Sequence, residues 1–511
     1  MKAEASNNSR LTKNTLALYV RMLMLMLISL YTSRITLDVL GNEDYGIYNV
    51  VGGIVVFFTF FNGTMATATQ RFLSFDIAKG DIGNLSRTFS LTCWIHIALA
   101  VIIIVAAEIG GLWLLYNKMN LPSDRMDAAF WVFQCSILTT VISVTQVPYN
   151  ASIIAHEKMG IYAYLSILDI IFKLLLVILL QWINADKLIL YAMLTLCINM
   201  IMLTIYRTYC IKNFKECHIS FVWDKDKFKR LCSFAGWNLS AQVADIGRTQ
   251  GVNIILNIFC GPALNAARAI AVVVNGVVTQ FVSNFMTALN PQVVKYYANG
   301  EKEAMFLLVR RGCKYSSFLL LFLMVPLLLE TDFILNLWLK EPPAYASIFC
   351  KLIMISSMIN TLSSTVFFAT MASGEIRNYQ ICMSTLILTV PVLSYIGYEL
   401  GLPPYSCLYP EILVCIISLF LRPYLTRMVT GFPISTYFTQ SIFPVILVFV
   451  ISFPIPLYLN TILEEGWMRL FAVCITNGIC VLVAVLLLGM SHSERKMFLG
   501  FIRKKVLRTV P

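Results

Sequence analysis

The amino-acid sequence predicts an all-α polytopic membrane protein with about 14 transmembrane helices. Composition is the first reason: 58% of the 511 residues are hydrophobic and only 13% are charged, whereas about a quarter of a soluble protein is charged. Long apolar runs recur along the chain, which is the second reason. The third is that basic residues gather in alternate loops between these runs.

Fourteen apolar runs in the sequence are long enough to cross a bilayer, because about 20 helical residues span about 30 Å of hydrocarbon. The first run follows a polar, basic segment without a short apolar core and cleavage site, so we expect it to be retained as a helix. The runs begin near Leu16, Tyr45, Thr88, Ala128, Met159, Leu188, Leu231, Leu264, Tyr315, Leu352, Asn378, Tyr405, Tyr437 and Leu470.

The basic residues orient these runs. With the N-terminus in the cytoplasm, 28 of the 39 Lys and Arg residues lie in cytoplasmic loops and termini, six lie outside, and five lie within runs. This bias indicates an even number of spans, with both termini in the cytoplasm. The net charge of +12 therefore orients the chain and does not indicate nucleic-acid binding. The external loops are short, so we expect the function to reside in the helical bundle.

An internal repeat divides the chain. Residues 41–85 align with residues 261–305 without a gap, so that Gly41 meets Gly261 and Asp81 meets Glu301. Both segments have the same predicted membrane orientation, which indicates a parallel repeat. We therefore predict two six-helix lobes, residues 1–215 and 216–430, followed by two helices and a basic tail in residues 431–511. Repeated halves around a central site are typical of transporters.

Three of the five intramembrane basic residues are Arg21, Arg34 and Arg268, each within about two turns of a predicted helix end. A charge near the bilayer centre costs about 3 kcal/mol on insertion scales. These three side chains either snorkel to the interface or face a cavity.

The other two basic residues, Lys173 and Arg248, lie in the middle of their runs. Each follows an acidic residue by about one turn, Asp169 and Asp245 respectively. One interpretation is a self-neutralising structural ion pair on each helix. The other is a cavity charge that contacts an anionic substrate, with Asp169 or Asp245 changing protonation during transport.

Polar residues form stripes on the seventh and eighth helices, at intervals that place most of them on one face. Such stripes face either neighbouring helices, through hydrogen bonds, or a water-filled cavity. Two stripes on consecutive helices, with a weaker one on the second, favour a cavity lined by helices one, two, seven and eight. The candidate residues of the seventh helix are Asn238, Gln242, Asp245, Thr249 and Asn253, and those of the eighth are Asn265, Arg268, Asn275, Thr279, Ser283 and Asn290.

Signatures of other chemistry are missing from the sequence. The 14 Cys residues form no CxxC pair and the four His residues are scattered, so we predict no metal site. Without a P-loop, direct use of ATP is not expected. We predict no cofactor and no enzymatic activity.

Two segments carry a family resemblance. GWNLSAQVADIGRTQGVNIILNIFCGPALNAARAIA, residues 236–271, and LGNEDYGIYNVVGGIVVFF, residues 40–58, resemble oligosaccharide flippases of the polysaccharide transporter family. These export O-antigen and capsule repeats, and belong to the multidrug/oligosaccharidyl-lipid/polysaccharide (MOP) superfamily. The lipid II flippases of that superfamily are similar in having 14 helices and functional arginines on the first and eighth. That pattern matches Arg21, Arg34 and Arg268.

The resemblance implies alternating access in a bacterial inner membrane. The implied substrate is an oligosaccharide on undecaprenyl diphosphate, moved to the periplasmic leaflet, and the implied partners are membrane lipids and other glycan-assembly proteins. The candidate substrate residues are Arg21, Arg34, Lys173, Arg248, Arg268, Asn238, Gln242, Asn253 and Asn275. Two alternatives stay open: a multidrug/cation antiporter of the same superfamily, and a membrane glycan polymerase or ligase.

Overall fold

The computed structural model describes residues 2–57, 65–66, 69–70, 72–73, 76–77, 81–156, 158–183, 185–220, 224–491 and 494–496. The regular structure of these ranges is entirely helical, as predicted. The α-helices are α1 (Lys2–Phe57), α3 (Ile82–Ala106), α4 (Leu112–Asn117), α5 (Met126–Ala155), α6 (Met159–Leu180), α7 (Lys187–Asn213), α8 (Lys225–Cys260), α9 (Pro262–Ala298), α10 (Lys302–Leu329), α11 (Thr331–Trp338), α12 (Ala346–Ser364), α13 (Phe367–Ser373), α14 (Arg377–Glu399), α15 (Tyr409–Thr430), α16 (Ile434–Tyr437), α17 (Phe443–Ser452), α18 (Pro454–Ile462) and α19 (Trp467–Ala484). Short 3-10 or π segments are η1 (Ala107–Gly111), η2 (Ser123–Arg125), η3 (Pro404–Leu408), η4 (Phe438–Ile442) and η5 (Val485–Gly489).

Each predicted apolar run begins on a helical segment. Eleven helical segments of the described chain are long and apolar enough to cross a membrane. The first two runs begin on α1, which consists of two helical segments that meet at Gly41. The chain is thus a multi-pass membrane protein, and fourteen crossings remain a prediction.

The two aligned glycines, Gly41 and Gly261, have nearly the same backbone conformation. Gly41 has φ 77° and ψ 173°, and Gly261 has φ 81° and ψ 175°. A side chain disfavours this conformation, whereas glycine adopts it readily. The repeat therefore places a glycine at the same sharp break, before the second half of α1 and before α9.

The chain packs as two compact units. The first comprises Met1–Ile270, Pro343–Tyr345 and Ser384–Cys407, and the second comprises Ala271–Pro342, Ala346–Met383 and Leu408–Pro511. Helix α8 belongs to the first unit and packs on α1. The predicted lobes rest on the sequence repeat and not on packing, so their boundaries after residues 215 and 430 remain predictions.

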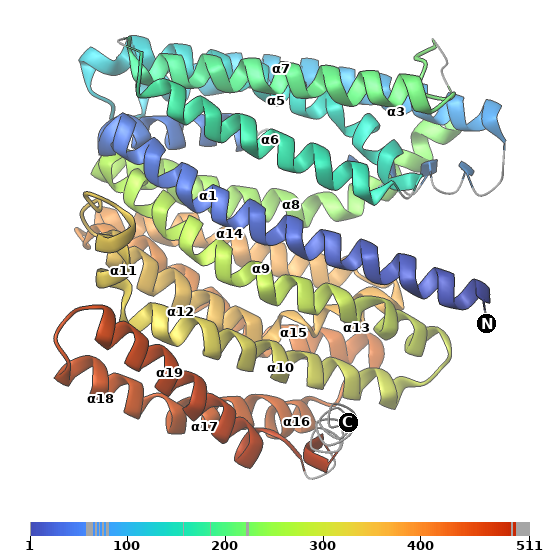
Figure 1. Ribbon diagram of the computed structural model, residues 1–511. Coiled ribbons are helices and arrows are strands. Elements are labelled where there is room, and N and C mark those ends of the chain that lie inside the picture. Colours follow the sequence, from blue (N-terminus) through green and yellow to red (C-terminus); the bar gives the residue numbers. More distant parts are fainter. Residues whose placement is uncertain are drawn as a thin grey trace. The chain divides into compact units, whose positions relative to one another are not determined.

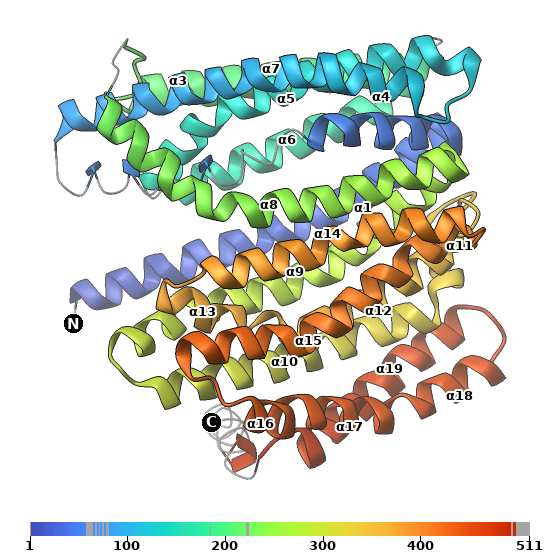
Figure 2. The same ribbon diagram turned by 180° about the vertical axis from the view of Figure 1, so that it is seen from behind.

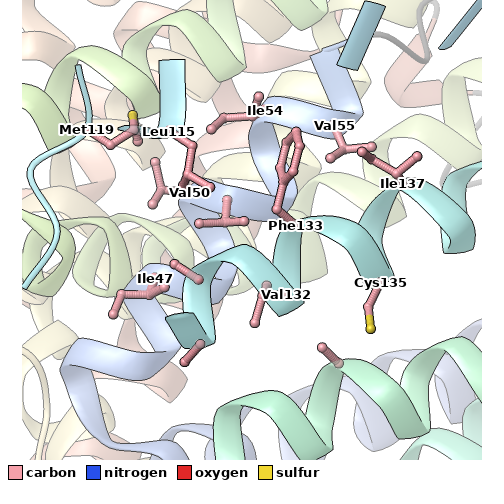
Figure 3. Close-up of a cluster of buried hydrophobic side chains, with 14 of the residues drawn as sticks. Ile47, Val50, Ile54, Val55, Leu115, Met119, Val132, Phe133, Cys135 and Ile137 are labelled. Atoms are coloured by element: carbon pink, nitrogen blue, oxygen red, sulfur yellow. The ribbon is translucent and has the colours of Figure 1, made fainter. Parts of the chain in front are cut away.

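The first unit is organised around α1, α5 and α7. Helices α5 and α7 lie side by side in both views (Figure 1, Figure 2), and α5 also packs against α1 and α3. Phe133 of α5 is fully buried among Val50 and Ile54 of α1 and Leu115 of α4 (Figure 3). A Cβ on Gly111 would lie 2.5 Å from the Phe133 ring. Glycine at that position therefore lets the segment η1 approach α5 closely.

The second unit contains α10, which packs against α12, α17 and α19. Fully or nearly buried residues of α10, α17 and α19 share one apolar cluster that includes Phe318, Val448 and Val481. Ion pairs join α10 to this C-terminal part at the end of the helix and within its first half. Glu330 follows α10 and pairs with Arg469, while Lys314 pairs with Glu494 beyond α19.

Candidate functional site

A polar cavity of about 410 Å³ lies within the first unit, between α5, α6 and α7. Its volume falls in the range of about 300–1,000 Å³ that is typical of small-molecule sites. Eight of its eleven lining residues are polar. The lining residues are Ser143, Gln146, Val147, Asn150, Tyr162, Ser166, Asp169, Ile170, Asn199, Met202 and Tyr206.

Helical periodicity explains how these residues meet. On α6, Tyr162, Ser166 and Asp169 are three or four positions apart, so their side chains lie on one face of the helix. Asn199 and Tyr206 of α7 share the face of that helix that also carries Met202. Each helix therefore contributes a short polar stripe, and the three stripes meet at the cavity.

Hydrogen bonds within the helices leave acceptor oxygens at the cavity. Ser166 donates its hydroxyl to the Tyr162 carbonyl at 2.7 Å, and Asn199 donates Nδ2 to the Thr195 carbonyl at 2.8 Å. The amide oxygen of Asn150 is buried and has no hydrogen-bond partner among the described residues. A buried polar atom in this state is destabilising unless a ligand or water satisfies it.

An ion pair borders this cavity. Lys173 Nζ donates to Asp169 Oδ2 at 2.8 Å, one turn apart on α6. Their side chains retain 43% and 28% of their exposure, respectively, so water or a ligand can reach both groups. The predicted pairing of these two residues is present, and the pair adds no net charge to the site.

The polar stripes of the predicted seventh and eighth helices, α8 and α9, also meet within the first unit. Asn265 donates Nδ2 to both Oδ1 and the backbone carbonyl of Asn253, each at 2.7 Å. Asn253 in turn donates to the Asn49 carbonyl of α1 at 3.3 Å. These three residues thus form the interhelical hydrogen bonds that were one of the two interpretations of the stripes. A substrate-binding role for Asn253 stays a prediction.

The predicted basic residues of α8 and α9 differ in their surroundings. Arg248 pairs with Asp245 at 2.9 Å, and the Asp245 side chain is 63% exposed. Arg268 is buried, with 6% exposure, and lies close enough to Tyr398 of α14 for an electrostatic interaction. A buried guanidinium requires compensating groups, which makes Arg268 the more constrained of the two arginines.

The remaining candidates are dispersed. Arg34 is half-buried on α1, and Gln242 is exposed on α8. Asn275 is half-buried on the part of α9 that belongs to the second unit. The side chains of Arg21 and Asn238 lie outside the described part of the chain.

Most of the cavity lining was missed by the sequence analysis. Gln146, Asn150, Tyr162, Asn199 and Tyr206 lie within or at the ends of long apolar runs. A search for polar residues spaced three or four apart on each run would have found them. What such a search lacks is the packing of α5, α6 and α7, which brings the three stripes together.

Charged residues also connect the helix ends of the first unit. Arg125 pairs with Asp44 and, at 2.7 Å, with Asp186, whose carboxylate caps the N-terminus of α7. Burial alone would raise the pKa of Asp186, but hydrogen bonds from Arg125 and from backbone N–H groups hold it below its usual value. The network fixes three chain segments at one end of this unit.

In the described part, no group of three or more His, Cys, Asp or Glu side chains could hold a metal ion.

Three of the solved structures that match this fold are described as transporters or a flippase. A lipid II flippase, MurJ, in an inward closed conformation matches with a TM-score of 0.65 and 13% identity, over 93% of this chain and 98% of its own. An inward-facing multidrug resistance transporter of the MATE family matches with a TM-score of 0.65 and 12% identity, over 81% of this chain and 98% of its own. A MOP superfamily transporter from Pyrococcus furiosus, whose binding pocket is described as having reverse polarity, matches with a TM-score of 0.56 and 12% identity, over 82% of this chain and 96% of its own.

No family model matches the sequence, and no curated protein matches it either. Identities of 11–13% among the structures establish the fold alone. The chain therefore has the helical fold of MOP superfamily transporters, and the substrate has to be argued from its own residues.

Proposed function

We propose that the chain is a flippase that moves an undecaprenyl-diphosphate-linked oligosaccharide from the cytoplasmic to the periplasmic leaflet of a bacterial inner membrane. The main support for this proposal is the share of the chain that each solved structure matches. The lipid II flippase matches 93% of the chain, whereas the multidrug transporter, matched over nearly its whole length, covers 81%. The chain is thus longer than a multidrug transporter of that size, as we expect of a flippase with additional helices.

The basic residues supply the second argument. A diphosphate offers paired oxygens that suit the planar donor groups of arginine. Arg268 is a buried cation, and Arg248 keeps 24% of its side-chain exposure beside Asp245. In the proposed mechanism these arginines attract the diphosphate, together with Arg21 and Arg34, while the prenyl tail stays in lipid.

Energy for the movement comes from outside the chain. The membrane potential drives an anion outward by about 2.3 kcal/mol per charge per 100 mV. Coupling to an ion through Asp169 or Asp245 would add to this driving force. Asp169 is the better placed of the two, because its carboxylate lines a cavity and forms an ion pair with Lys173 at 2.8 Å.

A multidrug/cation antiporter is the second candidate. The observation in its favour is a TM-score of 0.65 to a multidrug transporter, equal to that for the lipid II flippase. Cationic drugs call for unpaired acids, however, whereas Asp169 and Asp245 both have basic partners. A glycan polymerase or ligase has less support, since short external loops leave little room for catalytic groups.

Transport in proteoliposomes tests the proposal. The probe is a fluorescent undecaprenyl-diphosphate oligosaccharide, and its arrival in the other leaflet is read with an impermeant reagent. We expect transport by the native chain and at least a tenfold loss in Arg268→Ala, with Lys187→Ala, an exposed residue at the start of α7, as the matched control. Normal transport in both Arg248→Ala and Arg268→Ala would contradict the cationic mechanism. Ethidium efflux without lipid transport would establish the antiporter instead.

A further inference from the structure

The size of the cavity between α5, α6 and α7 limits what it can hold. At about 410 Å³, it is far larger than the site of a single ion, because one water molecule accounts for about 30 Å³ of liquid. A ring-shaped polar molecule with its hydration water fits this space. Since the cavity lies within one unit, its shape is set by three adjoining helices.

The charge of the cavity restricts the ligand further. Asp169 is the one charged residue among those that line it, and the Lys173 ammonium neutralises this carboxylate at 2.8 Å. The remaining polar groups are hydroxyls and amides. Neither a diphosphate nor a free cation gains a net coulombic attraction from such a site, so its chemistry favours an uncharged ligand.

The hydrogen-bonding groups identify the class of uncharged ligand. Because Ser166 and Asn199 donate to their own helices, their oxygens remain as acceptors, and the buried Asn150 oxygen has no partner among the described residues. Hydroxyl groups satisfy acceptors of this kind and accept hydrogen bonds in return. The lining also includes the rings of Tyr162 and Tyr206, whose faces suit the C–H surface of a sugar ring.

We infer that the α5–α6–α7 cavity binds an uncharged sugar residue. This inference rests on the proposed function for the source of the sugar, which is the glycan of the lipid-linked substrate. It assigns the recognition of the glycan to the first unit, at residues distinct from the arginines that attract the diphosphate. Glycan selectivity then depends on Gln146, Asn150 and Asn199, which offer amide groups to the sugar hydroxyls.

Binding to the purified full-length chain in lipid nanodiscs tests this. The probes are neutral hexoses, deoxyhexoses and N-acetylhexosamines, with sodium chloride and inorganic diphosphate as charged comparisons, measured by calorimetry. We expect at least one neutral sugar to bind, and Asn199→Ala to weaken that binding at least tenfold. The matched control is Asn213→Ala, because Asn213 makes the same 2.8 Å bond to the carbonyl four residues earlier on α7, but is exposed and outside the cavity.

Three outcomes would overturn the inference: no neutral sugar binds, Asn199→Ala and Asn213→Ala bind equally, or only a charged probe responds to Asn199→Ala. The proteoliposome assay of the lipid-linked substrate separates this from the proposed function. Sugar binding without lipid transport leaves the sugar site standing and refutes the flippase. Lipid transport without sugar binding supports the flippase and refutes the sugar site.

Discussion

Arg469 donates three hydrogen bonds to the carboxylate of Glu330, from Nε at 3.0 and 3.1 Å and from Nη2 at 2.8 Å. Glu330 is completely buried, and Arg469 retains 14% of its side-chain exposure. Asn460 adds a further bond to Glu330 at 2.9 Å. The carboxylate at the end of α10 thereby holds α18 and α19, which lie in the part of the chain predicted to follow the two six-helix lobes.

We predict that Arg469→Met destabilises the second unit by about 3–5 kcal/mol, because it leaves the Glu330 charge buried without its partner. The measurement is thermal or denaturant unfolding of the purified chain. Lys351→Met is the matched control, since Lys351 pairs with Asp332 at 2.7 Å but the two side chains are 36% and 58% exposed. There we expect a loss of no more than about 1 kcal/mol. Equal effects of the two substitutions would contradict the importance of the buried pair.

The ionisation of Glu494 provides a prediction of how the stability of the chain depends on pH. Burial would raise the pKa of Glu494, but hydrogen bonds from Lys314 and the Ser491 backbone lower it to about 2, from a usual 4.5. A carboxylate with a depressed pKa stabilises the fold above its unfolded-state pKa, and this contribution disappears as pH falls toward the folded-state value. We therefore expect the midpoint temperature of thermal unfolding to decrease as the pH is lowered from about 4.5 to about 2.

The control for this prediction is Glu494→Gln, which cannot ionise. At neutral pH it should be less stable than the native chain by about 1.5–3 kcal/mol, the usual range for hydrogen bonds to charged groups. The difference between the two proteins should then shrink in acid. A difference that is independent of pH would mean that the Lys314–Glu494 pair, 2.7 Å apart, does not stabilise the charged form of Glu494.

The break before α9 gives a third prediction. Gly261 has φ 81°, and a Cβ there would meet only Asn120 Nδ2, at 3.9 Å. Gly261→Ala should destabilise the chain by about 1 kcal/mol or more through backbone strain alone. Gly276→Ala within α9, where a Cβ meets nothing within 4 Å, should be neutral or stabilising by up to about 1 kcal/mol. Unfolding of the two variants under the same conditions compares them, and similar stabilities would refute the role of the positive φ.

Local sequence signals predicted the helices better than the site. Apolar runs and alternating basic loops depend on the bilayer itself, so they can be read without knowing which helices touch. The glycine pair, Gly41 and Gly261, was also visible as a repeat, and the backbone angles agree. By contrast, Arg469 and Glu330 are 139 residues apart in the sequence, and nothing in either segment indicates that they meet.

The candidate site illustrates the same limit. The ion pair of Asp169 with Lys173 was one of the two interpretations drawn from the sequence, because it depends only on spacing along one helix. The cavity beside it depends on how three helices pack, and its amides at positions 146, 150 and 199 lie on two different helices. For Asn253 and Asn265, polarity alone could not distinguish a cavity from the hydrogen bonds that they make with each other.

The pair of Asp169 and Lys173 provides the last prediction, which separates a structural from a coupling role. We expect Asp169→Asn and Lys173→Met to lower transport at least tenfold each, because either leaves a charge beside the cavity without its partner. The double variant Asp169→Asn/Lys173→Met has no such charge, so its stability should return to within about 1 kcal/mol of the native chain. If Asp169 carries the coupling ion, transport in proteoliposomes should nevertheless stay low, and its dependence on an imposed pH gradient should vanish. Full recovery of gradient-driven transport in the double variant would reduce the pair to a structural element of α6.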